Sequence, residues 1–352
     1  MNSPVDRSTT ARRKHRFATA LILALLAAAA VVIAPSASAF PPAGTVTTYP
    51  GITNPSYATQ GPDGAMWVTS FGTNSLSRMT TSGTVTATYT GNAFTFPTRI
   101  VTGGDGNLWF LRQGQALVRM TTAGVTTEFT GPAFTGVVAL EVAADGTLWI
   151  GNYQTPSISH IDLNGNVLLT RSVVTSGNLI NIAVGANGTV YFADQSSSIG
   201  VVAPNGQLST IQTPLTSVSS VATDPDGSVW FSNNSPSGSM GRVAANGSIS
   251  IFAQGQVDSC FTIARDVDGA FWCNGANAVT RVDATGTSTQ FPTSNATTGV
   301  TSGPNRTMWF PMAYADLMAQ ISMGDPPVTP TTSTTAASTD PNADVLAPAY
   351  TG

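Results

Sequence analysis

Residues 61–67 read Gly-Pro-Asp-Gly-Ala-Met-Trp, and this short unit decides the fold because it returns along most of the chain. Five of its six further copies keep an Asp-Gly or Asn-Gly pair, whereas the last copy, at 305–309, has lost the glycine. All six tryptophans of the chain occupy the final position of the unit, and a tyrosine takes that position once. The further copies end at Trp109, Trp149, Tyr191, Trp230, Trp272 and Trp309, spaced 37 to 42 residues apart.

Two other landmarks recur with the same period. About eleven residues after the aromatic residue comes Arg78, Arg119, His160, Val201, Arg242, Arg281 or Gln320. A glycine turn follows at Gly83, Gly124, Gly165, Gly206, Gly247 and Gly286. Because Asp-Gly and Asn-Gly pairs supply the positive φ of tight hairpins, each unit is interpreted as four short strands.

A period near 40 with four strands per unit is typical of a propeller blade. Parallel β-helices have shorter periods, and the 3.6-residue apolar spacing of helical repeats is missing. The sequence therefore predicts an all-β protein, a seven-bladed β-propeller. We interpret the repeated tryptophans as packing between adjacent blades and the repeated arginines as structural.

The two ends of the repeat array complement each other. The seventh unit offers only three strands before Pro326 and Pro327, and residues 44–49 look like a fourth strand without a blade of its own. We expect this N-terminal strand to complete the last blade, which closes the ring and removes an open sheet edge.

Composition limits the classes of partner. Only 9% of the residues are charged, and without residues 1–39 the chain carries 17 acidic residues against 9 arginines and no lysine. A basic surface for nucleic acid is therefore absent, and we expect no nucleic-acid partner. We also expect a monomer with no membrane span in the mature chain.

The segments outside the repeats predict export. Residues 1–39 combine a basic region, an apolar run and a small-residue end, the pattern of a secretory signal peptide; a transmembrane helix is the alternative. The propeller then occupies 40–324, and the Pro/Thr/Ser-rich residues 325–352 are expected to be a disordered tail. A secreted or cell-surface location makes a disulfide between Cys260 and Cys273 the default expectation, because both flank one predicted hairpin turn.

Residues suited to acid and base chemistry are sparse. After residue 39 the chain has one histidine, His160, and two glutamates, Glu128 and Glu141. His160 stands where other blades have arginine, so we interpret it as structural. No phosphate-binding loop, clustered metal ligands or calcium-loop spacing occurs, and no cofactor is expected.

The stretches 61–69, 77–79 and 83–86 resemble the virginiamycin B lyase (streptogramin lyase) family, whose blades repeat G-P-D-G-x-x-W-F-T-E, I-G-R-I-T and G-x-I-T-E-F. The resemblance extends from residue 44 to about 324. It implies a seven-bladed propeller and a lyase that opens a cyclic depsipeptide with Mg²⁺ and a histidine base.

The family's functional positions carry other residues in this chain. The positions of the histidine hold Ser56, Thr98, Val138, Ile180, Ser219, Phe261 and Thr298. The positions of the glutamate hold Ser70, Arg112, Asn152, Asp194, Asn233, Gly275 and Met312. Among the latter, Asp194 alone could supply a carboxylate to a metal.

Three functional hypotheses follow. The first is a propeller that binds a small-molecule or cell-surface ligand and has lost the lyase site; two of its candidate residues are arginines, which could hold a carboxylate. The alternative is a divergent Mg²⁺-dependent C–O lyase acting on streptogramin B, with Asp194 placing the metal. The third is a purely structural surface protein. The candidate ligand-binding residues are Ser56, Tyr57, Thr98, Arg99, Arg112, Asn152, Asp194 and Asn233.

Overall fold

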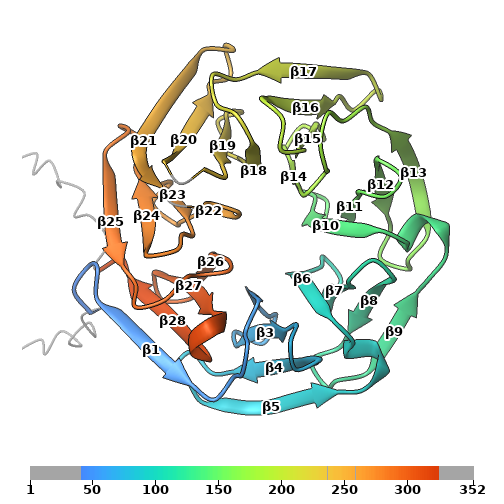
Figure 1. Ribbon diagram of the computed structural model, residues 1–352. Coiled ribbons are helices and arrows are strands. Elements are labelled where there is room, and N and C mark those ends of the chain that lie inside the picture. The colour runs from blue at the N-terminus through green and yellow to red at the C-terminus, as the bar shows by residue number, and fades with distance from the viewer. Residues whose placement is uncertain (1–40, 236, 258, 325–352) are drawn as a thin grey trace, which may run out of the picture. The chain divides into compact units, whose positions relative to one another are not determined.

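The computed structural model describes residues 41–324 apart from residues 236 and 258. These residues form seven four-stranded antiparallel sheets arranged as blades around a central channel (Figure 1). In each blade the first strand lies nearest the channel and the fourth lies at the rim. The predicted seven-bladed β-propeller is confirmed.

The strands follow the repeat. Blades one to three contain β2 (Tyr57–Gln60), β3 (Met66–Ser70), β4 (Ser75–Met79), β5 (Val85–Thr90); β6 (Pro97–Thr102), β7 (Leu108–Arg112), β8 (Ala116–Met120), β9 (Thr126–Phe129); and β10 (Val137–Val142), β11 (Leu148–Asn152), β12 (Ser157–Ile161), β13 (Val167–Ser172). Blades four and five contain β14 (Asn181–Val184), β15 (Val190–Ala193), β16 (Ser198–Val202), β17 (Leu208–Gln212); and β18 (Val218–Thr223), β19 (Val229–Asn233), β20 (Gly238–Val243), β21 (Ile249–Val257).

Blade six contains β22 (Ile263–Arg265), β23 (Phe271–Cys273), β24 (Ala278–Val282) and β25 (Ser288–Pro292). Blade seven contains β26 (Thr301–Gly303), β27 (Thr307–Met312), β28 (Leu317–Ser322) and, as its rim strand, β1 (Val46–Pro50). The described residues also contain three short 3₁₀ helices: η1 (Asn92–Phe94), η2 (Pro132–Phe134) and η3 (Ala313–Ala315).

The ring closes through β1, as predicted. This strand pairs antiparallel with β28, with Tyr49 opposite Met318. The Tyr49 ring stacks on Trp309 with 5.4 Å between ring centroids, and Gln320 donates a 2.6 Å hydrogen bond to the Tyr49 hydroxyl. The N-terminal strand thus brings blade seven the rim aromatic that other blades supply themselves, as Tyr89 does for Trp67 in blade one.

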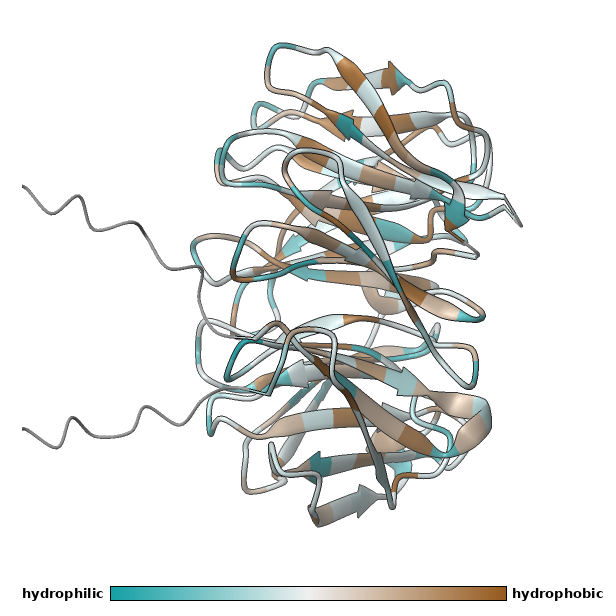
Figure 2. Ribbon diagram, turned by 90° about the vertical axis from the view of Figure 1, so that its left-hand side faces the viewer, coloured by the Kyte–Doolittle hydropathy of each residue, from teal (hydrophilic) through white to brown (hydrophobic). Residues whose placement is uncertain are grey.

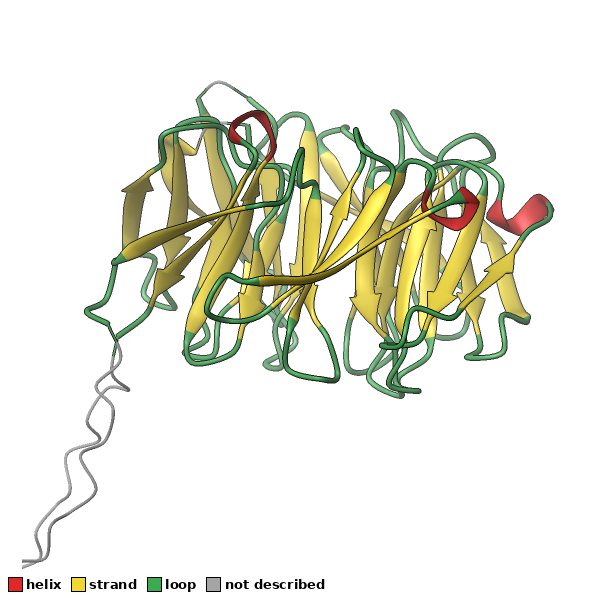
Figure 3. Ribbon diagram, turned by 90° about the horizontal axis from the view of Figure 1, so that it is seen from below, coloured by secondary structure: helices red, strands yellow, loops and turns green. Residues whose placement is uncertain are grey.

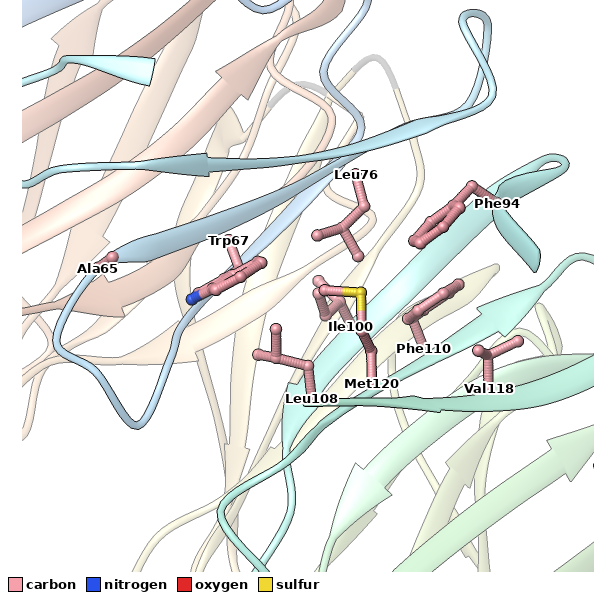
Figure 4. Close-up of a cluster of buried hydrophobic side chains, with 9 residues drawn as sticks. All are labelled: Ala65, Trp67, Leu76, Phe94, Ile100, Leu108, Phe110, Val118 and Met120. Carbon is pink, nitrogen blue, oxygen red and sulfur yellow. The ribbon is translucent and has the colours of Figure 1, made fainter. Parts of the chain in front are cut away.

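The repeated tryptophans pack between blades. Trp67 is fully buried and contacts a cluster from blade two that includes Leu108, Phe110 and Met120 (Figure 4). Similar clusters join the other neighbouring blades, and hydrophobic residues are concentrated along the strands (Figure 2). The interpretation of the tryptophans as core residues is confirmed.

In blade one, the aspartate of the Asp-Gly turn holds Trp67 in place through a hydrogen bond to its carboxylate. Asp63 accepts a 3.0 Å hydrogen bond from the indole nitrogen of Trp67 and a 2.7 Å hydrogen bond from Nε of Arg78. In blade three His160 replaces the arginine: its ring stacks on Trp149 at 4.5 Å, and its Nε2 lies 2.6 Å from the Thr147 hydroxyl. These contacts support a structural role for both residue types.

The second turn of blade one packs against the rim strand of blade seven. Gly83 has a φ of +87°, and a Cβ atom there would overlap the ring of Tyr49. The glycine therefore serves both the turn conformation and the close approach of two blades.

Cys260 and Cys273 form the expected disulfide, with their Cα atoms 5.7 Å apart. No helix within the described part of the chain is long and apolar enough to cross a membrane. The predicted signal peptide at 1–39 and the predicted tail at 325–352 lie outside the described residues.

Candidate functional site

The two faces of the ring differ in what they carry. The Asp-Gly turns that join first and second strands lie on one face, which we call the turn face. The three short helices lie together on the opposite face, at the upper edge in Figure 3. We call this the cavity face, because a cavity at the mouth of the central channel opens there.

A cavity of about 470 Å³ lies at the mouth of the central channel on the cavity face. We call it the mouth cavity. Its walls come mainly from the residues just before or at the start of the first strands, and from loops between second and third strands. The lining consists of Tyr57, Thr98, Arg99, Gln113, Val138, Ile180, Gln195, Ser259, Phe261, Gly275, Ala276, Ala296, Thr297, Thr298 and Tyr314. This volume suits a drug-sized ligand.

Arg99 is the one charged residue in that lining. Its guanidinium lies 4.7 Å from the ring centroid of Tyr57, a cation–π contact that positions the charge. The Arg99 side chain forms no ion pair with, and donates no hydrogen bond to, any other residue that the structure describes. The cavity therefore has apolar and neutral walls with a single positive group that is free to meet a ligand.

Below the mouth cavity a second hollow, of about 450 Å³, runs between the innermost strands. We call it the central channel. Tyr57 and Arg99 line both hollows, so they stand at the junction between the two. The other charged residues lining the channel are Glu141 and Arg265. Arg265 is already paired, since its Nε lies 3.1 Å from a carboxylate oxygen of Asp224.

Glu141 is the carboxylate of the channel lining. It lies on β10, and no side chain in the described residues forms an ion pair with it. Burial raises its pKa from 4.5 to about 7, because an ionised carboxylate is poorly solvated there; the backbone of Val142 and the charge of Arg99 oppose this rise only in part. The side chain keeps some accessible surface, which faces the channel.

The positions that hold histidine in the resembled family do reach the cavity. Thr98, Val138, Ile180, Phe261 and Thr298 line it, and none of them can act as a proton-transferring base. Thr298 donates a 2.8 Å hydrogen bond to the carbonyl oxygen of Ser56. Ser56 and Ser219 themselves lie outside the lining: the Ser56 hydroxyl accepts from the backbone nitrogen of Phe71, and the Ser219 hydroxyl donates to the carbonyl of Cys260.

The polar residues at the glutamate positions hold loops of their own blades. Both carboxylate oxygens of Asp194 accept hydrogen bonds, one at 2.8 Å from Ser176 N and the other at 3.1 Å from Ser196 N. Asn152 accepts from the backbone of Gln154 at 2.9 Å.

Asn233 and Arg112 are occupied in the same way. Asn233 accepts a 2.7 Å hydrogen bond from Ser239 N. Arg112 donates to the carbonyl of Asn92 at 3.2 Å and lies 3.3 Å from a carboxylate oxygen of Glu128. None of these four side chains lines the mouth cavity, so Arg112 does not join Arg99 there.

The residues present do not build a resident metal site around Asp194. Its carboxylate is buried and already accepts two backbone hydrogen bonds. No group of three or more potential His, Cys, Asp or Glu ligands occurs in the described residues. Mg²⁺ prefers oxygen ligands arranged as an octahedron, and one engaged carboxylate does not offer this.

The structure thus brings together three of the predicted contact residues, Tyr57, Thr98 and Arg99, and adds residues that the sequence analysis missed. Phe261 and Tyr314 add exposed aromatic surface at the rim of the cavity. A sequence signal did exist for Glu141. It stands eight residues before the repeated aromatic position, where the other blades have Thr59, Val101, Ala183, Ala222, Ala264 and Thr301.

Comparison with known proteins adds two findings. The sequence model of the virginiamycin B lyase family matches residues 38–167 and 133–330. No curated protein matches the chain significantly.

Solved structures share the fold at low sequence identity. A catalytically inactive variant of virginiamycin B lyase from Staphylococcus aureus, solved with quinupristin, is 18% identical, with a TM-score of 0.69 over 79% of this chain and 99% of that one. A streptogramin B lyase structure gives the same identity and TM-score over 79% and 97%. The extracellular domain of a hybrid two-component system from B. thetaiotaomicron is 15% identical, with a TM-score of 0.65 over 79% of this chain and 41% of that one.

Proposed function

From the premise that this chain belongs to the virginiamycin B lyase family, we propose that it acts as an exported ligand-binding propeller without the lyase reaction. The observation that carries the proposal is the mouth cavity: it is of ligand size, yet it offers no histidine at the positions where the family's base is expected. A binding role needs only the cavity and its walls.

The physical character of the cavity indicates the kind of ligand. Val138, Ile180 and Phe261 give it apolar walls, and Tyr314, whose side chain is largely exposed, can cover one side of a bound molecule. Burial of apolar ligand surface against such walls contributes roughly 25 cal/mol per Å² before the entropic costs of binding are subtracted. We therefore propose a largely apolar ligand of a few hundred Å³.

Export is part of the proposal and rests on the N-terminal sequence pattern and the disulfide. A disulfide persists in oxidising compartments, and the Cys260–Cys273 bond is compatible with an extracellular location. Detection of the protein in culture medium with a new N-terminus near residue 40 would support export, whereas a cell-bound chain that retains residues 1–39 would contradict it.

The binding role is tested with a neutral fluorescent probe, N-phenyl-1-naphthylamine, on residues 40–324. We expect saturable binding with one site per chain, because the probe is apolar and small enough for the cavity. Ala276→Trp, which fills the cavity from its wall, should abolish this binding. Ala123→Trp, at an exposed turn on the turn face, is the matched control and should leave it unchanged. Binding that survives Ala276→Trp would refute the assignment.

The lyase alternative is tested separately. The chain is incubated with quinupristin, the molecule found with the inactive Staphylococcus aureus variant, with and without Mg²⁺. Because ring opening by elimination leaves the mass unchanged, the products are separated by reversed-phase chromatography and identified by their fragmentation in tandem mass spectrometry. We expect the intact compound under both conditions. Linearised product that depends on Mg²⁺ would establish the divergent lyase instead.

A further inference from the structure

Arg99 lies where the mouth cavity and the central channel meet, and Glu141, of opposite charge, lies in the channel lining. Neither residue has an ion-pair partner among the described residues. Arg99 lines both hollows, whereas Glu141 lines the central channel but not the mouth cavity. The two residues lie on the neighbouring inner strands β6 and β10. A ligand in the mouth cavity therefore contacts Arg99 from above, while Glu141 acts on the same guanidinium from the channel.

Arg99 suits an anionic group on the ligand. The guanidinium is held over the Tyr57 ring at 4.7 Å, which limits its position while leaving its N–H donors without a partner in the described residues. Guanidinium groups bind carboxylate, sulfonate and phosphate through paired hydrogen bonds. Three other charged groups near the cavity face are already engaged: Arg112 is paired with Glu128, and Asp194 accepts two backbone hydrogen bonds.

Glu141 competes with such an anion whenever it is ionised. The elements around it offer few other charges. The adjacent strands β11 and β14 carry no titratable side chain, and β6 contributes Arg99. Strand β7, which also packs against β10, carries Arg112, and this residue is paired with Glu128. Across the channel Arg265 is paired with Asp224. Tyr57 is the remaining titratable group at the junction. The charge state of Glu141 therefore decides how much of the Arg99 charge is available to a ligand.

We propose that the mouth cavity selects apolar ligands carrying one anionic group, which Arg99 binds, and that this binding is coupled to protonation of Glu141. The inference rests on the proposed binding function and specifies its ligand class and its control. The ligand anion takes the place of the Glu141 charge beside Arg99, so Glu141 takes up a proton from solvent when the ligand binds. Affinity should accordingly rise as the pH falls through the neutral range.

Two probes that differ in one charge test the proposal on residues 40–324. The first is 8-anilinonaphthalene-1-sulfonate, whose sulfonate stays ionised at all the pH values used. The second is N-phenyl-1-naphthylamine, which has the same rings without the sulfonate. Affinities are measured by fluorescence titration near pH 5.5 and near pH 8.5, and circular dichroism checks that the protein is folded in each case.

We expect the anionic probe to bind about three- to tenfold more tightly at the lower pH, because removing one nearby charge changes the interaction by that order. The neutral probe should show no such change. Glu141→Gln should hold the anionic probe at its low-pH affinity at both pH values. Arg99→Gln should reduce the anionic probe to the affinity of the neutral one and remove its pH dependence.

Each outcome bears on one of the two proposals. Equal affinity of the anionic probe at both pH values in the unmodified protein, or a pH dependence that survives Glu141→Gln, overturns the coupling. Unchanged affinity of the anionic probe in Arg99→Gln overturns the anion site. In both cases, binding of the neutral probe that is sensitive to Ala276→Trp would leave the proposed function standing. If neither probe binds in the cavity, the proposed function itself fails.

Discussion

Replacing Glu141 with glutamine is expected to stabilise the protein at alkaline pH and to have little effect at acidic pH. The folded carboxyl has a pKa of about 7 against an ordinary value of 4.5, so the folded state holds its proton more tightly than the unfolded chain does. The resulting cost is absent below about pH 4.5, grows as the pH rises, and is complete above about pH 7. Glutamine has a similar shape and never ionises, so it avoids this cost.

The magnitude follows from the two pKa values. Each pKa unit corresponds to about 1.4 kcal/mol, so the rise from 4.5 to about 7 limits the gain in the free energy of unfolding from Glu141→Gln to about 3 kcal/mol. Part of the side chain faces the channel and retains solvent, which lowers the expected gain to about 1–2 kcal/mol at pH 8.

The assay is urea unfolding of residues 40–324, followed by tryptophan fluorescence at about pH 4.5, 6 and 8. Glu128→Gln is the matched control, because it removes a glutamate from a rim strand where the carboxylate is partly exposed beside Arg112. We expect this control to lower stability by about 0.5 kcal/mol or less. A difference between Glu141→Gln and the unmodified protein that stays constant across the three pH values would refute the reasoning.

Three further predictions concern the fold. Tyr49→Ala should cost about 2–4 kcal/mol, similar to Tyr89→Ala, because each removes a ring stacked on a buried tryptophan; a cost below about 0.5 kcal/mol in urea unfolding would contradict closure by β1. Gly83→Ala should lower the melting temperature well beyond Gly247→Ala, because both sites have positive φ but only Gly83 faces the Tyr49 ring; equal losses would show that the close approach is unimportant. Asp194→Ala should lower the free energy of unfolding by about 1–3 kcal/mol, because two backbone N–H groups lose their acceptor. If the carboxylate is structural, titration calorimetry with Mg²⁺ should give the same heat of binding for the unmodified protein and for the variant.

The residues at the lyase-family positions were predicted to line one site, and the structure places only some of them there. Counting along the repeat brought Thr98 and its neighbours Tyr57 and Arg99 to one surface, and the structure places all three in the mouth cavity. The same counting included Arg112 and Asp194, whose side chains turn to partners within their own blades. Backbone register determines which end of a strand a residue occupies, but local hydrogen bonding decides where its side chain points.

The sequence by itself determined the seven blades, the closing strand and the packing role of the tryptophans. These features follow from local turn chemistry and from a period that repeats, so each copy confirms the others. The disulfide was predictable for a similar reason, since both cysteines flank one hairpin turn.

Only the tertiary structure decided the mouth cavity and the placement of Arg99 and Glu141 on two neighbouring inner strands that line the central channel. The cavity is a space enclosed by residues from six of the seven blades, and no single repeat contains it. The raised pKa of Glu141 arises from its burial beside the central channel, a property of the assembled ring. Charge and burial at the centre of a ring depend on every blade at once, whereas strands and turns depend on a few residues each.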